Sequence, residues 1–250
     1  MLTGWLAGGL DARRVVVIEP MPSDEMKALA AKGIRLNPSA KDTGTVETLV
    51  VAVKPQSFRE AGAALKPFAG PNTLVVSIMA GATIASISEV CGGAVVRAMP
   101  NTPAAIGRGI TVAVAANNVS AAQRAVADAL LQAIGAVEWV DDETLMDAVT
   151  AVSGSGPAYV FLLAEELARA GVEAGLPPEL ATKLARETVA GSGELLRRSE
   201  FDSATLRVNV TSSGGTTAAA LEVLMGADGM QSLLTRAVAA ATKRSRELAK

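Results

Sequence analysis

A polar loop that leads into an alanine-rich stretch carries the residues best suited to chemistry in this sequence. It reads Asn209-Val-Thr-Ser-Ser-Gly-Gly-Thr-Thr-Ala-Ala-Ala-Leu221. Gly214 and Gly215 can adopt backbone angles that other residues avoid, so consecutive N–H groups can turn toward one point. A helix that begins near Thr216 would aim its own unbonded N–H groups at the same point. The loop therefore predicts an anion site of a size for a carboxylate or a phosphate.

A second interpretation of the same loop needs no ligand. Serine and threonine are among the residues that most often cap the first turn of a helix. The hydroxyls of Ser212, Thr216 and Thr217 can therefore either cap the helix or donate hydrogen bonds to a bound molecule. The residues of the loop leave both interpretations open.

The absence of histidine limits the chemistry more than any other feature of the composition. It excludes Ser-His-Asp and Cys-His nucleophiles and the usual zinc sites, so no metal site is predicted. General acid–base catalysis would have to use hydroxyl groups, carboxylates, lysine or water. A cytoplasmic enzyme that relies on a cofactor fits these limits. The single cysteine, Cys91, is expected to be a small buried apolar residue.

Charge and hydropathy exclude several kinds of partner. Half of the 250 residues are hydrophobic, the net charge is −2 and aromatic residues make up 3%. We therefore expect a folded core, no nucleic-acid partner and no membrane partner. No run of about eighteen uninterrupted apolar residues occurs. No charged-then-apolar leader begins the chain, so secretion is not expected.

Strands and helices are predicted to alternate through the first half of the chain, after the tail of a helix at residues 1–10. The predicted strands are residues 14–18, 48–53, 73–78, 94–98, 110–115 and 137–140, and the predicted helices include residues 23–32, 58–65 and 120–134. This alternation predicts an α/β fold with a mostly parallel sheet. Lys54-Pro55, Ala80-Gly81 and Asn101-Thr-Pro103 all follow strand ends, so they should converge on one crevice.

The second half of the chain is predicted to be helical. Helices are expected at residues 157–174, from Pro177-Pro178 onward, after the polar loop that begins at Asn209 as far as Met225, and from residue 230 to the end. The pattern predicts a first domain at residues 1–146 and an all-α domain at residues 147–250. A helical domain of this size more readily completes its apolar core with a second copy of itself. We therefore expect a homodimer.

Four motifs then point to one family. They are Val51-Ala-Val-Lys-Pro55, Met99-Pro-Asn-Thr-Pro103, Ser153-Gly-Ser-Gly-Pro-Ala-Tyr159 and Asn209-Val-Thr-Ser-Ser-Gly-Gly-Thr-Thr217. In this order and spacing they resemble pyrroline-5-carboxylate reductase, the last enzyme of proline biosynthesis, over nearly the whole chain. The resemblance implies a Rossmann-type domain that binds NADPH or NADH, followed by a helical dimerisation domain. It also implies hydride transfer to the C=N carbon of pyrroline-5-carboxylate to give L-proline, and dimers that often assemble into rings.

The resemblance assigns roles by position. Val53, Lys54 and Pro55 would line the cofactor, Ala80 and Asn101 would lie near the nicotinamide, and Asn209 would approach the cofactor, from its own or from a partner subunit. The substrate-binding residues would be Val210, Thr211, Ser212, Ser213, Gly214, Gly215, Thr216 and Thr217. As the hydride arrives, the imine nitrogen gains electron density and needs a donor. Because histidine is absent, the hydroxyl of Thr217 is the best-placed donor, directly or through a water molecule.

The sequence departs from the family pattern in three places. The family begins with a strand and a Gly-x-Gly-x-x-Gly turn, whereas this chain starts inside the following helix, at Met1-Leu-Thr-Gly-Trp-Leu6. We expect a start codon upstream of Met1, and weak cofactor affinity and low stability for the 250 residues alone. Glu19 occupies the end of a strand where a carboxylate favours the ribose 2′-hydroxyl of NADH over the 2′-phosphate of NADPH, unless it is only a solvated strand-end acid. Ser213 stands where the family usually has proline.

Two other functions compete with this interpretation. β-Hydroxyacid dehydrogenases resemble this architecture, but they place a catalytic lysine about one turn inside the long interdomain helix. Residues 157–167 contain glutamates and no lysine, which argues against that class. The other alternative is a non-catalytic nucleotide-binding or dimerisation protein that has lost the glycine-rich turn.

Overall fold

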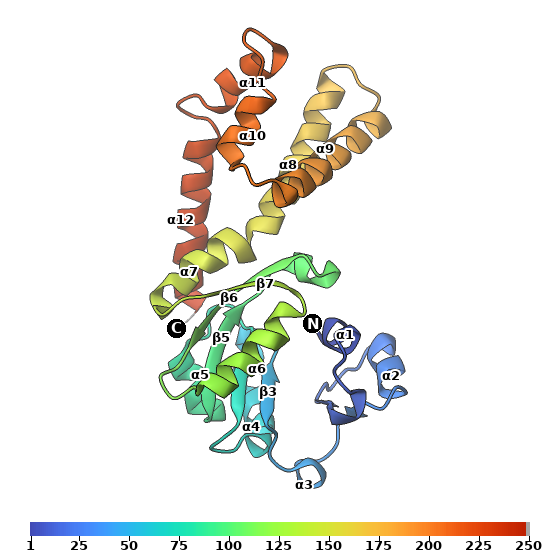
Figure 1. The fold of residues 1–250 in the computed structure, drawn as a ribbon, viewed down its shortest axis with the longest axis vertical. Helices are drawn as coiled ribbons and strands as arrows, with labels where there is room; N and C mark the ends of the chain where they lie inside the picture. The colour runs from blue at the N-terminus through green and yellow to red at the C-terminus, as the bar shows by residue number, and fades with distance from the viewer. Residues whose placement is uncertain (249–250) are drawn as a thin grey trace. The chain divides into compact units, whose positions relative to one another are not determined.

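The structure is a computed structural model that describes residues 1–248, and it divides into two compact units. The first unit comprises Met1–Gly154 together with the C-terminal residues from Thr242, and the second comprises Ser155–Ala241. The division falls at the end of a short π-helical segment, Thr150–Gly154. The domain boundary between residues 146 and 147 stays a prediction. Figure 1 labels the α-helices of both units and the strands β3, β5, β6 and β7.

A five-stranded sheet forms the centre of the first unit. Its order is β3 (Thr48–Val51), β4 (Leu74–Ser77), β5 (Ala94–Met99), β6 (Gly109–Ala115) and β7 (Gly135–Trp139). All neighbouring pairs are parallel except β5 and β6. The predicted mostly parallel sheet is therefore confirmed.

Two short strands form a separate parallel pair, β1 (Val16–Val17) with β2 (Arg35–Leu36). The sequence predicts a longer strand at residues 14–18 that is buried on both faces, and that prediction is wrong. Val16 and Val17 are only partly buried, because β1 pairs with β2 alone among the strands of residues 1–248. The β2 strand was not predicted, since two residues carry no periodic signal.

Side-chain caps start most of the predicted helices of the first unit. Ser23, Thr83 and Ser120 each accept a hydrogen bond from the first turn of the following helix. The helices are α1 (Leu2–Ala7), α2 (Asp24–Ala30), α3 (Ala40–Thr43), α4 (Phe58–Leu65), α5 (Ile84–Cys91), α6 (Ala121–Gln132) and α7 (Met146–Val149). These caps explain why the helix starts could be located from the sequence.

Alternate residues of the central strands fill two apolar clusters. Val75 and Val95 belong to a cluster that contains Phe58 and Cys91, whereas the next residue in each strand, Val76 or Val96, belongs to a second cluster. Because successive side chains of a strand point to opposite faces, the sheet is buried on both sides. Burial also raises the pKa of the Cys91 thiol, so the expectation of a small buried apolar residue is confirmed.

The second unit consists of helices. They are α8 (Gly156–Glu173), α9 (Pro178–Arg198), α10 (Ser203–Asn209), α11 (Thr216–Leu224) and the first part of α12 (Met230–Leu248). A Cβ atom added at Gly171 would lie 3.3 Å from the Cβ of Ala181, so glycine allows α8 and α9 to pack closely. The α10 helix was not predicted. No helix within residues 1–248 is long and apolar enough to cross a membrane.

Candidate active site

The predicted cofactor-binding residues follow the carboxyl ends of parallel strands. The β3, β4 and β5 strands run in the same direction and end at Val51, Ser77 and Met99. Each is followed within four residues by a predicted contact, since Val53–Pro55 follow β3, Ala80 follows β4 and Asn101 follows β5. These residues therefore lie along one edge of the first unit, where α/β sheets bind their ligands.

One apolar cluster includes residues that lie close in the chain to several of these positions. Ile18, Val53, Met79 and Ala82 all pack in or against the cluster that includes Val51. They are the neighbours of Glu19, Lys54 and Ala80 in the chain. The structure places Val53, Lys54, Pro55, Ala80 and Asn101 at this edge of the first unit, and Glu19 follows Ile18, which packs against the same cluster.

Asn101 shows how the fold orients a polar side chain at this edge. Its Oδ1 atom accepts a hydrogen bond from the Ile110 N–H at 3.0 Å. The side chain is partly buried. Because the amide oxygen is bound to β6, the Nδ2 group is the part of the side chain that remains to donate to a ligand.

Glu19 lies two residues beyond β1 and is partly buried. Its Oε1 atom accepts a hydrogen bond from the Met21 N–H at 2.9 Å. Its backbone N–H and C=O groups both bond to the side chain of Asn37, at 2.8 Å each. The carboxylate is therefore held by its own loop, and its Oε2 atom remains as an acceptor.

The predicted substrate loop belongs to the second unit. Asn209 is the last residue of α10, and α11 begins at Thr216. Gly214 has a φ of +68°, which is the left-handed conformation that glycine adopts most easily. A Cβ atom on Gly215 would lie against the Ser212 hydroxyl and 3.2 Å from the Ser212 C=O, so a larger residue would make that serine shift. The structure thus confirms a glycine turn that runs directly into a helix.

The start of α11 carries no side-chain cap. Gly215 is the N-cap residue, and no side chain bonds to the first turn. The first backbone bond of the helix runs from the Ala219 N–H to the Gly215 C=O at 3.2 Å, so the N–H groups of residues 216–218 lie ahead of it. The hydroxyl of Thr211 instead donates to the Arg207 C=O at 2.7 Å. The interpretation of this loop as an ordinary hydroxyl cap is therefore not what the structure shows.

The hydroxyl-bearing residues of the loop differ in how exposed they are to solvent. Thr217 is partly buried, whereas Ser212, Ser213 and Thr216 are exposed. Thr217 is thus the hydroxyl at the helix start whose surroundings differ most from bulk water.

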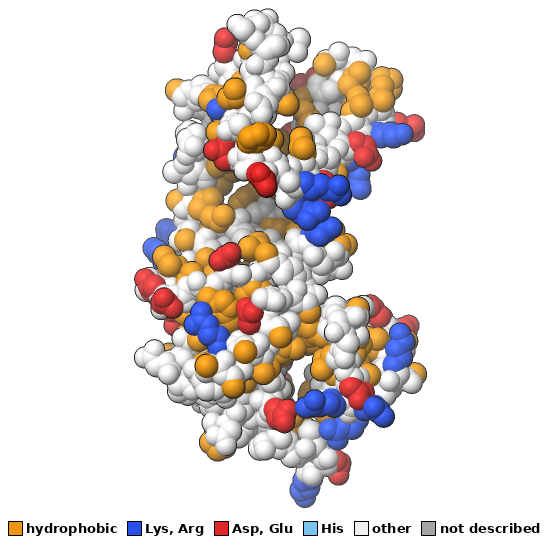
Figure 2. Space-filling model, viewed as in Figure 1, with side chains coloured by type: hydrophobic (Ala, Val, Ile, Leu, Met, Phe, Trp, Pro, Cys, Tyr) orange, Lys and Arg blue, Asp and Glu red, His pale blue; other side chains and the backbone are white. Residues whose placement is uncertain are grey.

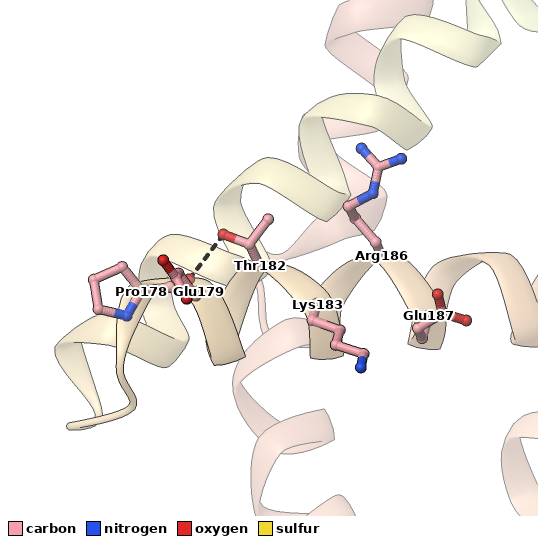
Figure 3. Close-up of a pocket in the computed structure, with 6 residues that line it drawn as sticks. All are labelled: Pro178, Glu179, Thr182, Lys183, Arg186 and Glu187. Atoms are coloured by element: carbon pink, nitrogen blue, oxygen red, sulfur yellow. Dashed lines mark hydrogen bonds between the residues drawn. The ribbon is translucent and has the colours of Figure 1, made fainter.

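Two cavities lie apart from the residues predicted to form the site. One, of about 500 Å³, is lined by residues of α9 alone: Pro178, Glu179, Thr182, Lys183, Arg186 and Glu187. Figure 3 shows these exposed side chains along one helix, which gives no enclosed site for chemistry. A second, of about 460 Å³, lies at the amino ends of β3 and β4, opposite the carboxyl ends. Among residues 1–248 no group of histidine, cysteine or acidic side chains is arranged to hold a metal ion.

Comparisons with known proteins point to a single family. A family model described as pyrroline-5-carboxylate reductase dimerisation matches residues 143–248. A pyrroline-5-carboxylate reductase from Pseudomonas aeruginosa is 41% identical over 98% of this chain and 92% of its own length. One from Synechocystis is 46% identical over 87% of this chain and 81% of its own length.

Solved structures agree with these sequence matches. The structure of a pyrroline-5-carboxylate reductase from Coxiella burnetii matches with a TM-score of 0.90 and 33% identity, covering 100% of this chain and 93% of its own. A Plasmodium falciparum pyrroline carboxylate reductase, solved with NADP bound, matches with a TM-score of 0.83 and 28% identity, covering 99% of this chain and 92% of its own.

Proposed function

The chain belongs to the pyrroline-5-carboxylate reductase family, and from this premise we propose how its residues carry out the reaction. The chain reduces 1-pyrroline-5-carboxylate to L-proline. When bound, NAD(P)H supplies the hydride to the C=N carbon. The relatives do not favour the two competing functions, a β-hydroxyacid dehydrogenase and a non-catalytic binding protein.

The edge formed by the carboxyl ends of the strands fits a dinucleotide. Lys54 is exposed and positively charged, and Asn101 keeps its Nδ2 donors free because its oxygen is bound to Ile110 N–H. In our proposal Val53, Lys54 and Pro55 line the cofactor, and Ala80 and Asn101 lie beside the nicotinamide. Asn209, at the end of α10, approaches the same cofactor. Glu19 accepts a hydrogen bond from the adenosine ribose and disfavours a 2′-phosphate.

The loop from Val210 to Thr217 holds the substrate in this proposal. The open N–H groups at the start of α11 suit the carboxylate of pyrroline-5-carboxylate, since a helix start and a glycine turn both favour an anion. The Thr217 hydroxyl then steadies the ring nitrogen, either as the donor or through a water molecule. Because a threonine hydroxyl is a weak acid, its main contribution is to position the ring.

The chain forms a homo-oligomer. We propose that the oligomer is built on a homodimer that covers the apolar side chains left exposed on the second unit. Several of these side chains are visible as orange atoms in Figure 2. A ring of such dimers, a cytoplasmic location and the lack of nucleic-acid or membrane partners stay predictions.

The proposal rests on the uncapped start of α11, and a substitution at Thr217 tests it. We expect Thr217→Ala to lower kcat by about tenfold or more, because a positioned donor near the nitrogen is lost. Thr182→Ala is the matched control, because that hydroxyl bonds only within α9, to the Pro178 C=O at 2.9 Å. The measurement is steady-state reduction of pyrroline-5-carboxylate with NADH and with NADPH. Unchanged turnover in Thr217→Ala would assign the donor role to water alone.

A further inference from the structure

Asn37 has an unusual backbone conformation. Its φ is +50°, the only positive value at a non-glycine residue among residues 1–248. It follows β2 directly and precedes Pro38. Such conformations persist in folded proteins only where surrounding contacts hold them, and they are common at functional sites. The contacts of Asn37 therefore indicate what this conformation is for.

The side chain of Asn37 continues the pairing of β1 with β2 after the backbone of β2 has turned away. The Arg35 N–H donates to the Val15 C=O at 3.0 Å, and the Asn37 N–H donates to the Val17 C=O at 2.8 Å. The next backbone donor of this ladder would come from residue 39. Instead, the Asn37 Oδ1 accepts from the Glu19 N–H and its Nδ2 donates to the Glu19 C=O, both at 2.8 Å.

Asparagine suits this position for two reasons. Its amide group offers a donor and an acceptor on one short side chain, so it can replace both backbone partners of a strand. Asparagine also enters the left-handed region more readily than most residues. Aspartate would keep the acceptor and lose the donor, and glycine would keep the backbone conformation and lose both.

The hydrogen bonds of the Asn37 side chain constrain Glu19. Asn37 holds both backbone polar groups of Glu19, and the Met21 N–H holds the Oε1 atom of its carboxylate at 2.9 Å. Met21 itself is 86% exposed, so the loop beyond Glu19 receives little support from packing. Asn37 therefore fixes the backbone of Glu19, from which the carboxylate extends to its bond with the Met21 N–H.

We propose that Asn37 is a positioning residue that sets the preference for NADH over NADPH by fixing Glu19 at the end of β1. This inference rests on the proposed contact between Glu19 and the adenosine ribose. A fixed carboxylate accepts a hydrogen bond from the 2′-hydroxyl and repels a 2′-phosphate. A carboxylate that can swing into solvent loses the hydrogen bond and discriminates less.

The test measures the Kd of NADH and the Kd of NADPH for the full chain, by nucleotide fluorescence. The variants are Glu19→Gln, Asn37→Gly and Asn37→Asp. Asn118→Gly is the matched control, because Asn118 is another exposed asparagine of the first unit, and its Nδ2 donates to the Gly93 C=O at 3.1 Å. Thermal unfolding and the rate of pyrroline-5-carboxylate reduction are recorded for each protein.

The wild type is expected to bind NADH more tightly than NADPH. Glu19→Gln is expected to reduce the ratio of the Kd of NADPH to the Kd of NADH. Asn37→Gly should raise the Kd of NADH by about fivefold or more while the Kd of NADPH changes by less than about twofold. Asn37→Asp should shift the ratio in the same direction, and Asn118→Gly should leave it unchanged.

The proposal is overturned if the Asn37 variants weaken both cofactors equally, which is the result of a merely structural role. It is also overturned if the Asn37 variants leave the Kd of NADH and the Kd of NADPH unchanged while Glu19→Gln changes the ratio of these two values. If Glu19→Gln has no effect, the ribose contact is wrong and the inference falls with it. In that case the reductase function still stands, because it is judged separately by the wild-type reaction.

Discussion

The two units of this chain differ in how much of their apolar surface one copy can bury. In the first unit, residues such as Val51, Ile87 and Leu131 are completely buried. In the second unit, Ala181 and Ala185 are the only buried apolar residues described between residues 155 and 241. The first unit thus completes its core within one chain, and the second does not.

The exposed side chains of the second unit are large. They include Phe161 at 66%, Val223 at 77% and Phe201 at 60% exposed. Exposed apolar surface on this scale marks an interaction site. The first unit therefore buries its apolar core within one chain, whereas the second unit leaves apolar surface that our proposed homodimer would cover.

The starts of two helices show a second difference. In the first unit, Ser120 and Gln123 form a reciprocal capping box that closes the start of α6. In the second unit, the start of α11 has no side-chain cap and follows a glycine turn. Capping is worth about 1 kcal/mol, so an uncapped start costs stability unless a ligand supplies the missing partner. In our proposal the carboxylate of the substrate is the partner of these open N–H groups.

The largest expected effect comes from a charge placed on the exposed apolar surface of the second unit. We expect Phe161→Asp to raise the dimer dissociation constant by about 100-fold or more, because an unpaired charge would be buried at the interface. Val126→Asp is the control, at an apolar side chain of α6 that is 45% exposed in the first unit. Light scattering over a range of concentrations measures both. An unchanged mass for Phe161→Asp would place the interface elsewhere.

A smaller effect is expected at a matched pair of glycines. Gly214 in the second unit and Gly107 in the first both have a φ of +68°, and a Cβ atom at either would meet nothing within 4 Å. Replacement by alanine should cost each site about 1–2 kcal/mol of backbone strain. Only Gly214→Ala should also raise the KM for pyrroline-5-carboxylate, by about fivefold or more, because the turn supports the substrate amides. Equal KM values in the two variants would contradict the role of this loop.

The smallest expected effect depends on pH. The hydrogen bond from the Thr205 N–H lowers the pKa of Asp202, which caps α10, by stabilising the carboxylate. A lowered folded-state pKa means that this stabilisation is present above the unfolded value of about 3.9 and is lost as the pH falls through the folded value. Amide exchange in α10 should therefore accelerate below about pH 4, after correction for intrinsic rates.

Two comparisons sharpen this pH prediction. Asp202→Asn should remove most of the pH dependence, because asparagine caps without ionising. The α6 helix should lack the effect, since Ser120 does not titrate. A similar pH dependence in α6 and α10 would show that the whole fold, and not the cap, is responding.

Much of the fold could be predicted from the sequence because local signals and tertiary structure agree. The apolar runs that became β3, β4 and β5 are bounded by turn residues, and Ser23, Thr83 and Ser120 each stand at the start of a helix, where their side chains form caps. The β2 strand was missed because it has only two residues and depends on pairing with β1, and α10 was missed because it has only seven residues. The burial of β1 was overestimated, since a β-branched run does not reveal how many neighbours a strand has.

The candidate site was predictable in part for similar reasons. The grouping of Lys54, Ala80 and Asn101 follows from strand direction, which the alternation of strands and helices implies. The open start of α11 could not be predicted, because serine and threonine in the loop are compatible with a cap or a ligand. The role of Asn37 also escaped the sequence, because it depends on hydrogen bonds to a residue eighteen positions away.

The central claim is that the amides at the start of α11 hold the carboxylate of the substrate. Backbone amide exchange at residues 213–218 tests it most directly, with the full chain alone, with saturating L-proline, and with saturating pyrrolidine, which lacks the carboxylate. L-Proline should slow exchange at these amides by about tenfold or more, and pyrrolidine should not. Unchanged exchange with L-proline, under conditions where binding is shown independently, would contradict the account.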